Sequence, residues 1–388
     1  MNQISMDDTA TAFKAKSDGE LKKAHLLFRA IGINWFVNMG PSLLKIAQAL
    51  RLPIKGIIKK TIFAQFCGGE NIEECSKTIE LLNKYHVGTI LDYSVEGEGN
   101  DESYQHTTNE TIDTILKAKD NPTIPFSVFK MTGVFPHDLL QAFTEKQSYN
   151  EQELEKAAAR VDKICKTAHD NHVRIFIDAE ESWIQNAIDH VAETMMQRYN
   201  KNTAIVYNTL QLYRHDRLDY LKKLHTMCAE YNIYMGVKLV RGAYMEKERL
   251  RAQQMSYPSP IQPDKKSCDH DYDESLKFCV EHISNTYVCV GTHNEQSSML
   301  MVKLMVDNNI DPCDERIYFS QLLGMSDHIS FNLSAAGYRV AKYVPYGPVK
   351  SVLPYLIRRA QENTSAKGQA GRELQLIEKE LKRRKSVK

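Results

Sequence analysis

The chain is 388 residues long, which suits one large domain or one large domain with a smaller arm. Its 50 Lys and Arg residues nearly balance its 49 Asp and Glu residues, so the overall charge points to no strongly charged partner. The sequence has no basic stretch with interleaved aromatic residues, which argues against nucleic-acid binding.

The cysteines and the N-terminus indicate the compartment. The eight cysteines are scattered and form no C-x-x-C pair, so we expect neither a zinc site nor a redox dithiol. Thiols used in this way are typical of a reduced cytoplasmic protein. The first residues, MNQISMDDTATAFKAKSDGE, are polar and acidic, unlike a signal peptide or an Arg-rich transit peptide. No apolar run approaches the roughly 18 residues of a membrane span. We therefore expect a cytoplasmic protein, at most peripheral at the inner face of a membrane.

Residues 1–85 are predicted to form a helical arm. The stretches GELKKAHLLFRAIGIN from Gly19 and GPSLLKIAQALRL from Gly40 carry apolar residues at three- and four-residue spacing, which is typical of amphipathic helices. The second stretch could lie on a partner or a membrane surface, but packing on its own domain is favoured.

From residue 86 onwards, eight short β-rich runs recur, each followed by a helical stretch. They are GTILDYSV from Gly88, PFSVFKM from Pro125, VRIFIDAE from Val173, TAIVYNTL from Thr203, YMGVKLVRG from Tyr234, YVCVGTHN from Tyr287, IYFSQLLG from Ile317 and AKYVPYG from Ala341. Their spacing, roughly 24 to 53 residues, leaves room for a crossover helix each time. The pattern predicts an α/β fold, a (β/α)8 TIM-type barrel over residues 86–365. A doubly wound open sheet is the competing fold, but the G-x-G-x-x-G loop that it usually carries is absent.

Two further segments are polar. The insert from about residue 246 to 274 contains SYPSPIQPDKKSCDHDYDES and is predicted to be a helix end and a surface loop. The tail, residues 366–388, contains GRELQLIEKELKRRKSVK and is predicted to be a charged helix with a basic end. This end could contact anionic lipid or a partner, but a solvated terminus is favoured.

Reactive groups in such a barrel lie at the C-terminal ends of the strands. The predicted strands end near polar side chains, many of them cationic or hydrogen-bonding: Lys130, Asp178, Glu180, Glu181, Gln211, Lys238, Arg241, Thr292, His293, Asn294, Gln321 and Tyr343. Arg358, Arg359 and Glu362 follow on a short predicted helix, YLIRRAQEN. This composition suits an anionic ligand held near a polar, flat cofactor.

Several of these residues have a simpler structural interpretation. Lys130 could be a surface lysine, and Asp178 could cap the helix that follows it. His293 could be a hydrogen-bonded core residue, and it lacks partners at metal-ligand spacing, so no metal site is expected. Tyr343 could be ordinary barrel packing, and the two adjacent arginines could lie on a solvated helix. A Schiff-base lyase acting through Lys130, with the Arg-Arg-Glu cluster as a clamp for a keto acid, and a non-catalytic binding barrel both stay open.

A series of blocks resembles the proline dehydrogenase family of flavin-dependent (β/α)8 barrels. From about residue 126 to 363 the chain carries, in the family's order, FKMTG, FIDAEES, LQLYRHDRLDYL, VKLVRGAYMEKER, GTHNE, QLLGM, KYVPYG and YLIRRAQEN. The resemblance implies FAD-dependent oxidation of L-proline to Δ1-pyrroline-5-carboxylate by hydride transfer to flavin N5, with the electrons passed to a quinone. Oxidation of 4-hydroxyproline is the alternative within the family.

The resemblance also implies substrate-binding roles. Arg358 and Arg359, with Lys130, would bind the substrate carboxylate and orient it at the flavin. Tyr343 and Leu322 would pack against the pyrroline ring. Because a relative that prefers hydroxyproline is expected to carry a smaller residue at this tyrosine, the bulky side chain favours proline. The implied catalytic and substrate residues are Lys130, Asp178, Tyr244, Leu322, Tyr343, Arg358 and Arg359.

The implied cofactor-binding residues are Gln211, Lys238, Arg241, Gly242, Ala243, Thr292, His293, Asn294, Gln321 and Glu362. Gln211 and Glu362 would contact the ribityl chain or ring edge of the flavin, and Asp178 would help hold Lys130 or Arg358. Many bacterial members carry Arg at the position of Lys238 and Lys at that of Arg241. This exchange puts the hydrogen bond to the flavin N5 region in doubt, because Lys is a point donor and Arg a planar fork.

The resemblance implies partners as well. Electron transfer to a quinone implies peripheral membrane contact, with the N-terminal helices or the basic tail as hypothetical contact surfaces. The chain has no room for an aldehyde dehydrogenase domain, so a separate pyrroline-5-carboxylate dehydrogenase is expected as the pathway neighbour.

Overall fold

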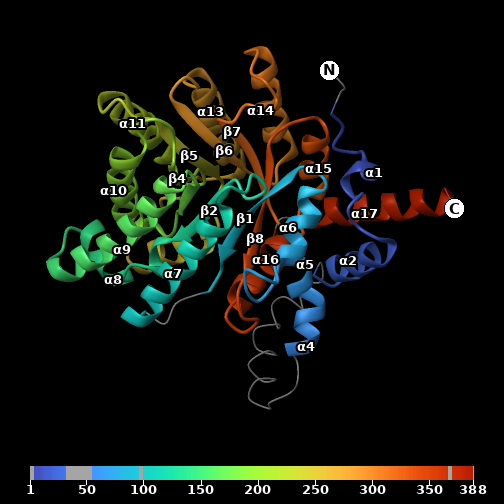
Figure 1. The fold of residues 1–388 in the computed structure, drawn as a ribbon, viewed down its shortest axis with the longest axis horizontal. Helices are drawn as coiled ribbons and strands as arrows, with labels where there is room; N and C mark the ends of the chain where they lie inside the picture. The colour runs from blue at the N-terminus through green and yellow to red at the C-terminus, as the bar shows by residue number, and fades with distance from the viewer. Residues whose placement is uncertain (1–3, 32–54, 96–98, 366–368, 388) are drawn as a thin grey trace. The chain divides into compact units, whose positions relative to one another are not determined.

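Eight parallel strands form a closed barrel in chain order, which confirms the predicted (β/α)8 fold. The computed structural model describes residues 4–31, 55–95, 99–365 and 369–387, without the side chains of residues 31, 55, 360–365, 369 and 370. The strands are β1 (Val87–Tyr93), β2 (Phe126–Lys130), β3 (Arg174–Asp178), β4 (Val206–Gln211), β5 (Met235–Val240), β6 (Thr286–Gly291), β7 (Ile317–Leu322) and β8 (Val340–Tyr346). Each predicted run therefore overlaps one strand (Figure 1).

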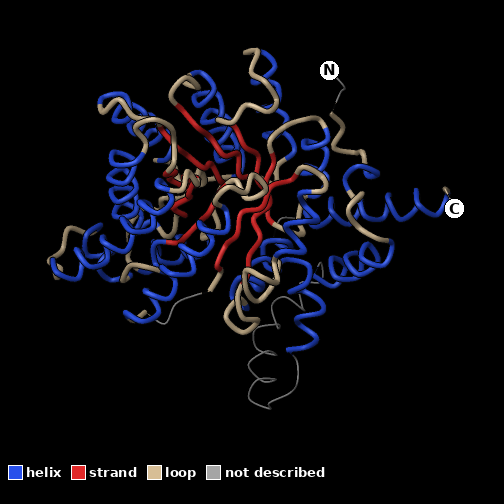
Figure 2. The backbone as a smooth tube through the Cα atoms, viewed as in Figure 1, coloured by secondary structure: helices blue, strands red, loops and turns tan. Residues whose placement is uncertain are grey.

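Helices follow every strand, as a parallel sheet requires for its crossover connections (Figure 2). They are α7 (Asp101–Ala118), α8 (His137–Thr144), α9 (Glu151–Asp170), α10 (Ser182–Tyr199), α11 (Arg217–Glu230), α12 (Met245–Gln254), α13 (Lys265–Glu281), α14 (Glu295–Asp307), α15 (Asp327–Ala335) and α16 (Leu353–Ser365). A short 3-10 helix, η2 (Met131–Gly133), directly follows β2. The chain divides into two compact units, residues 97–320 and residues 1–96 with 321–388.

In the unit of residues 97–320, aromatic side chains gather at the beginnings of the strands. The rings of Phe126 and Phe176 stack with centroids 4.3 Å apart, and Tyr318 meets Phe126 edge to face. The guanidinium of Arg174 lies 5.5 Å from the ring centroid of Tyr287. These groups form a packed apolar base, so the polar chemistry of this unit lies at the opposite, C-terminal ends of its strands.

The insert after β5 is more helical than predicted. Only residues 255–264 form the connection, and KKSCDHDYDES belongs to α13. Asp264 caps this helix by accepting the backbone N–H of Ser267 at 2.7 Å. The predicted helix end agrees with α12, but the predicted surface loop was wrong from residue 265 onwards. Cys268, Tyr272 and Leu276, spaced four apart, form a buried helical face there among polar residues.

The second unit contains β1, β8 and the helices near both chain ends. These helices are α1 (Thr9–Ala12), α2 (Asp18–Ile31), α4 (Lys55–Ile58), the π-helical turn η1 (Lys59–Phe63), α5 (Ala64–Phe66), α6 (Ser76–Asn83) and α17 (Gln369–Ser386). The first predicted amphipathic stretch corresponds to α2, and GPSLLKIAQALRL lies outside the described residues. The predicted helical arm is thus helical wherever it is described, apart from short connections.

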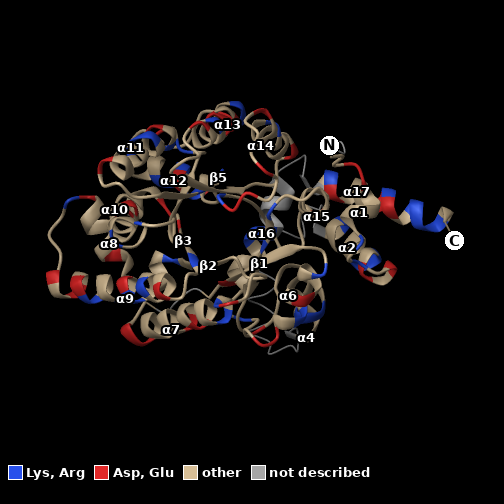
Figure 3. Ribbon diagram, turned by 45° about the horizontal axis from the view of Figure 1, so that its top comes forward, with Lys and Arg blue, Asp and Glu red and all other residues tan. Residues whose placement is uncertain are grey.

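The C-terminal helix α17 packs on α1 and α2 of the same unit (Figure 3). Leu376 and Ile377 are buried in one core cluster with Phe28. Arg384 donates hydrogen bonds to the carbonyl oxygens of Phe13 at 2.9 Å and Lys16 at 2.8 Å. The tail is helical as predicted, and Lys382, Arg383 and Lys385 at its basic end are exposed. The body of the helix is not solvated on all sides, because its charged sequence contains a buried apolar face.

Candidate functional site

Strands β3, β4 and β5 bring three polar side chains together at their C-terminal ends. Lys238 is buried and forms an ion pair with Asp178. Thr209, the register partner of Lys238, donates to the same carboxylate at 3.4 Å. The ammonium group of Lys238 also lies 4.9 Å from the ring centroid of Phe176.

Lys130 is the register partner of Asp178 on the neighbouring strand β2. The sequence-based hypothesis paired Asp178 with Lys130 or Arg358, and the structure adds Lys238 as a partner.

Arg241, just beyond β5, is held in one orientation. Its Nε donates to Asp269 at 2.7 Å, and its two terminal nitrogens donate to Thr292 at 2.8 Å and Ser297 at 2.9 Å. Its guanidinium lies 4.3 Å from the ring centroid of Tyr272. A guanidinium fixed in this way loses little conformational entropy when it binds an anion.

The turn between β6 and α14 contains three of the predicted cofactor residues. The hydroxyl of Thr292 accepts the backbone N–H of Asn294 at 3.1 Å. The side chain of Asn294 in turn caps α14 by accepting the N–H groups of Gln296 and Ser297. His293 lies between them and is partly exposed. Asn294 therefore has a local structural role, and any role towards a cofactor stays a prediction.

Gly242 and Gln211 shape the turn that follows β5. Gly242 has φ +123°, and a Cβ there would lie 2.5 Å from the ring of Tyr213, so only glycine fits. The side-chain oxygen of Gln211 accepts the N–H of Ala243 at 3.4 Å, while its NH2 group donates to the carbonyl oxygen of Glu180 at 2.7 Å. Gln211 thus connects the turns after β3 and β5.

Two buried glutamates in this unit were assigned no role from the sequence, although Glu180 was named among the polar residues at the strand ends. Glu180 accepts the N–H of Thr132 at 2.9 Å and its hydroxyl at 2.5 Å, and burial raises the pKa of Glu180 to about 7. Glu248, from α12, accepts the N–H and hydroxyl of Ser182 at 2.6 Å each and so caps α10. The run of acidic residues in FIDAEES signalled Glu180, but nothing in MEKERL distinguished Glu248 from a solvated residue.

In the unit of residues 1–96 and 321–388, the predicted substrate residues lie on β7, β8 and α16. Arg359 is only 8% exposed, and its guanidinium lies 5.1 Å from the ring centroid of Tyr355, one turn earlier. This burial argues against a solvated position for Arg359, whereas Arg358 is partly exposed. Tyr343 is buried and Leu322 is half-buried.

The remaining predicted residues are placed as follows. Gln321 is buried and accepts the hydroxyl of Ser330 at 2.7 Å. Tyr244 immediately precedes α12. Glu362 lies within α16, but its side chain is outside the described part of the chain. The substrate residues thus fall in both units, and their roles stay predictions.

The donors in the unit of residues 97–320 suit a cofactor that carries phosphates. Arg241 supplies a fixed guanidinium, Thr292 a hydroxyl, and α14 an N-terminus beside them. The backbone at Gly242 offers an approach that a side chain would block. These residues fit an anionic nucleotide cofactor. Among the described residues, no group of three or more His, Cys, Asp or Glu side chains could hold a metal ion.

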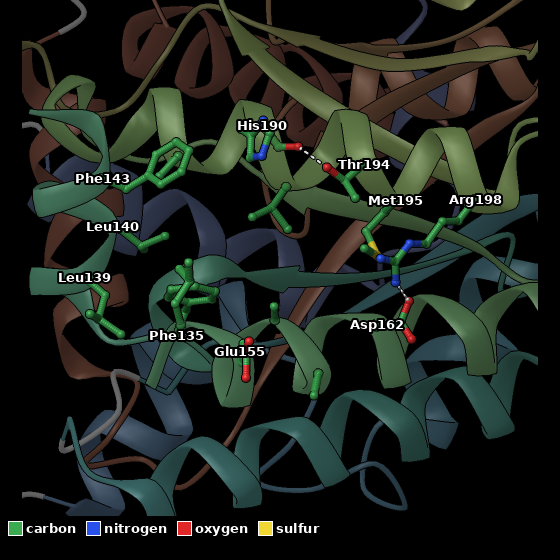
Figure 4. Close-up of a pocket in the computed structure, with 15 residues that line it drawn as sticks. Phe135, Leu139, Leu140, Phe143, Glu155, Asp162, His190, Thr194, Met195 and Arg198 are labelled. Carbon is green, nitrogen blue, oxygen red and sulfur yellow. Dashed lines mark hydrogen bonds and ion pairs between the residues drawn. The ribbon is translucent and has the colours of Figure 1, made fainter. Parts of the chain in front are cut away.

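An apolar groove of about 430 Å³ lies between α8, α9 and α10 and contains none of the predicted site residues (Figure 4). Phe135, Leu140 and Phe143 line it, and the ring of Phe143 stacks on that of His190 with centroids 5.2 Å apart. At its far end Arg198 pairs with an aspartate across 2.8 Å.

Comparison with known proteins identifies a matching family model and similar sequences. A family model described as "Proline dehydrogenase" matches residues 75–372. Proline dehydrogenase 1, mitochondrial, from Dictyostelium discoideum is 34% identical, over 97% of this chain and 74% of that protein. Hydroxyproline dehydrogenase from Xenopus laevis is 31% identical, over 96% of this chain and 88% of that protein.

Among solved structures, proline utilization A (PutA) from Bdellovibrio bacteriovorus, inactivated by N-propargylglycine, superposes with a TM-score of 0.74 at 19% sequence identity. The match covers 95% of this chain and 40% of that protein, so the chain spans about two fifths of its length. At this identity the similarity shows the barrel fold alone.

Proposed function

Because the chain belongs to the proline dehydrogenase family, we propose that it is an FAD-dependent enzyme that oxidises L-proline to Δ1-pyrroline-5-carboxylate. The observation that carries the proposal is the family match over residues 75–372, which includes every predicted substrate and cofactor residue. The buried cations at the strand ends support it, because a carboxylate substrate and a phosphate-bearing cofactor both need positive partners.

The proposed substrate chemistry follows from proline itself, a zwitterion with one carboxylate and one ring amine. Arg358, Arg359 and Lys130 would neutralise the carboxylate, and the planar guanidinium groups would fix its orientation. Tyr343 and Leu322 would pack against the ring and exclude water. The oxidation removes a hydride from C5 and a proton from the amine, which leaves a C=N bond. When bound, FAD supplies the hydride acceptor at N5.

The cofactor would be held mainly by residues after β5 and β6. Arg241 and Thr292 would bind its phosphates, because both present fixed donors. Lys238 would lie nearer the flavin ring, with its charge stabilised by Asp178. A direct test is the dissociation constant of FAD for Arg241→Met, measured by fluorescence quenching, which should rise relative to the wild type.

Oxidation of 4-hydroxyproline is the second candidate, and the relative named hydroxyproline dehydrogenase supports it. Tyr343 favours proline, because its buried ring would crowd a hydroxyl group on the substrate. The ratio of kcat/KM for the two substrates decides between them.

The proposed electron acceptor is a membrane quinone, reached by peripheral contact from the cytoplasm, with a separate pyrroline-5-carboxylate dehydrogenase consuming the product. No helix in the described part of the chain is both long and apolar enough to cross a bilayer. Some relatives carry "mitochondrial" in their names, so cell fractionation should test the compartment. Reduction of a soluble quinone analogue after proline addition would test the acceptor.

The first experiment is the anaerobic visible spectrum of the purified protein before and after L-proline. A flavin spectrum that bleaches supports cofactor, substrate and half-reaction together. A flavin spectrum that proline leaves unchanged refutes proline oxidation, and a protein that stays colourless with added FAD refutes the flavoenzyme. Trapping of a keto acid by borohydride would instead support the lyase acting through Lys130.

Arginine variants test the substrate roles. Arg359→Met should keep its flavin but lose about 10- to 100-fold in kcat/KM for proline, since a charge-assisted hydrogen bond contributes about 1.5–3 kcal/mol. The matched control is Arg198→Met, because Arg198 pairs with Asp162 on the outer helices. An equal loss in both variants would contradict the assignment.

A further inference from the structure

Two segments outside the family match converge on the turn between β7 and α15. The match covers residues 75–372, so neither Lys16 nor Glu373 belongs to it. Both lie in the unit of residues 1–96 and 321–388, as does the turn of residues 323–326. The contacts of Lys16 and Glu373 therefore belong to segments that the family model does not describe.

The converging residues form a buried ionic network. Asp327, the first residue of α15, pairs with Lys342 at 2.9 Å and with Lys16 at 3.2 Å. Burial opposes ionisation, but the two lysines hold the pKa of Asp327 well below its usual range. Glu373, from α17, accepts the backbone N–H of Ser326. Burial raises the pKa of Glu373, and Nδ1 of His328 lies 3.9 Å from its carboxylate.

The network also holds the backbone of the turn. Lys342 is fully buried, and besides Asp327 it donates to the carbonyl oxygens of Met325 and, at 3.3 Å, Leu322. The N–H of Leu323 donates to the carbonyl oxygen of Tyr343 at 2.8 Å. A displacement of the turn must therefore break several of these bonds together.

The N-terminal arm contributes a further bond. Gln65 donates to the carbonyl oxygen of Gly324 at 2.8 Å. Gly324 has φ +75°, and a Cβ there would lie 2.1 Å from the carbonyl oxygen of Gln65, so the two segments are in close contact. The turn is held from β8, from the N-terminal arm and from α17.

The predicted substrate residues adjoin this network along the chain. Leu322 begins the turn, and Tyr343 directly follows Lys342 on β8. Their side chains would contact the substrate ring, where a misplacement of about 1 Å can cost about 100-fold in rate. A buried ion pair that loses one partner leaves an uncompensated charge, so the network tolerates little rearrangement.

We propose that Glu373 and Lys16 are positioning residues for the substrate ring, acting through the turn of residues 323–326 on Leu322 and Tyr343. Through Glu373, the C-terminal helix α17 thereby affects the affinity for the substrate. This inference rests on the proposed function, since it needs a substrate whose ring those two residues contact. Glu373 and Lys16 touch no substrate themselves.

The test compares variants on one helix. Glu373→Ala should raise the KM for proline about tenfold, with kcat and flavin content changed much less. Glu373→Gln should rescue the KM, because its amide oxygen can still accept the N–H of Ser326. The control is Glu378→Ala, because Glu378 lies on the same helix, is exposed and contacts His25 instead of the turn.

Lys16→Met is the second variant, and it decides the question if Glu373→Ala does not fold. Lys16 lies at the partly exposed edge of the network, so its loss should be tolerated while the KM for proline rises. Binding of a ring carboxylate that lacks the amine, measured by calorimetry, should weaken in parallel.

An unchanged KM in a folded Glu373→Ala or Lys16→Met protein overturns the inference. So does a loss of flavin content in proportion to activity, which would mark a role in folding alone. A wild-type protein that binds flavin but does not respond to proline overturns the proposed function first, and the inference with it.

Discussion

Glu180→Gln should remove a pH-dependent loss of stability that the wild-type protein carries. Glu180 is 4% exposed, and burial raises its pKa from the ordinary 4.5 to about 7. Between these values the folded protein binds a proton that the unfolded chain has released, so stability falls as pH rises through this window and levels off above it. A shift of about 2.5 pKa units at 1.36 kcal/mol each amounts to about 3 kcal/mol.

Glutamine cannot ionise, and its amide can still accept the N–H of Thr132. The variant should therefore gain up to about 3 kcal/mol over the wild type between pH 4.5 and pH 8. Urea unfolding of both proteins across this range measures the gain, and Glu181→Gln is the matched control one residue away. A stability difference that stays constant with pH would refute the reasoning, and an equal gain in the control would assign the effect to local charge rather than to burial of Glu180.

Three further predictions concern other parts of the chain. Tyr343→Ser should raise kcat/KM for 4-hydroxyproline relative to proline, and an unchanged ratio in steady-state kinetics would count against ring crowding as the basis of preference. Asp189→Asn should lower the free energy of unfolding by about 3 kcal/mol or more, because Arg217, buried 2.6 Å from Asp189, loses a charged partner; a smaller loss on chemical denaturation would show that Asp216 compensates. Gly324→Ala should lower the melting temperature through a cost of about 1–3 kcal/mol, since φ +75° disfavours alanine and its Cβ meets a backbone oxygen; an unchanged melting temperature would mean that the turn can relax.

The barrel could be predicted because its signals are local. Strands such as Val206–Gln211 are short, β-rich and bounded by helical stretches, and eight of them in series allow few other folds. The polar residues that end these strands could also be located, because side chains after parallel strands gather at one end of a barrel. The family blocks then singled out Arg358, Arg359 and Tyr343 among them.

Composition did not predict burial for helices that are polar on average but apolar on one face. The stretch SYPSPIQPDKKSCDHDYDES contains the first part of α13, whose buried Tyr272 and Leu276 are separated by charged residues. The basic tail contains α17, in which Glu380 is fully buried between Arg383 and Arg384. Spacing, rather than charge content, decides such cases.

The sequence by itself determined the order of the elements, the strand ends that carry polar groups and the family of the chain. Only the tertiary structure decided which charges meet. Lys238 on β5 and Asp178 on β3 are 60 residues apart, and they pair because both strands lie in register with β4 between them. The same holds for Lys16, Asp327 and Lys342, which come from separate segments. Periodicity is a local property, whereas a buried ion pair depends on where the folded chain excludes water, and no short stretch of sequence specifies that.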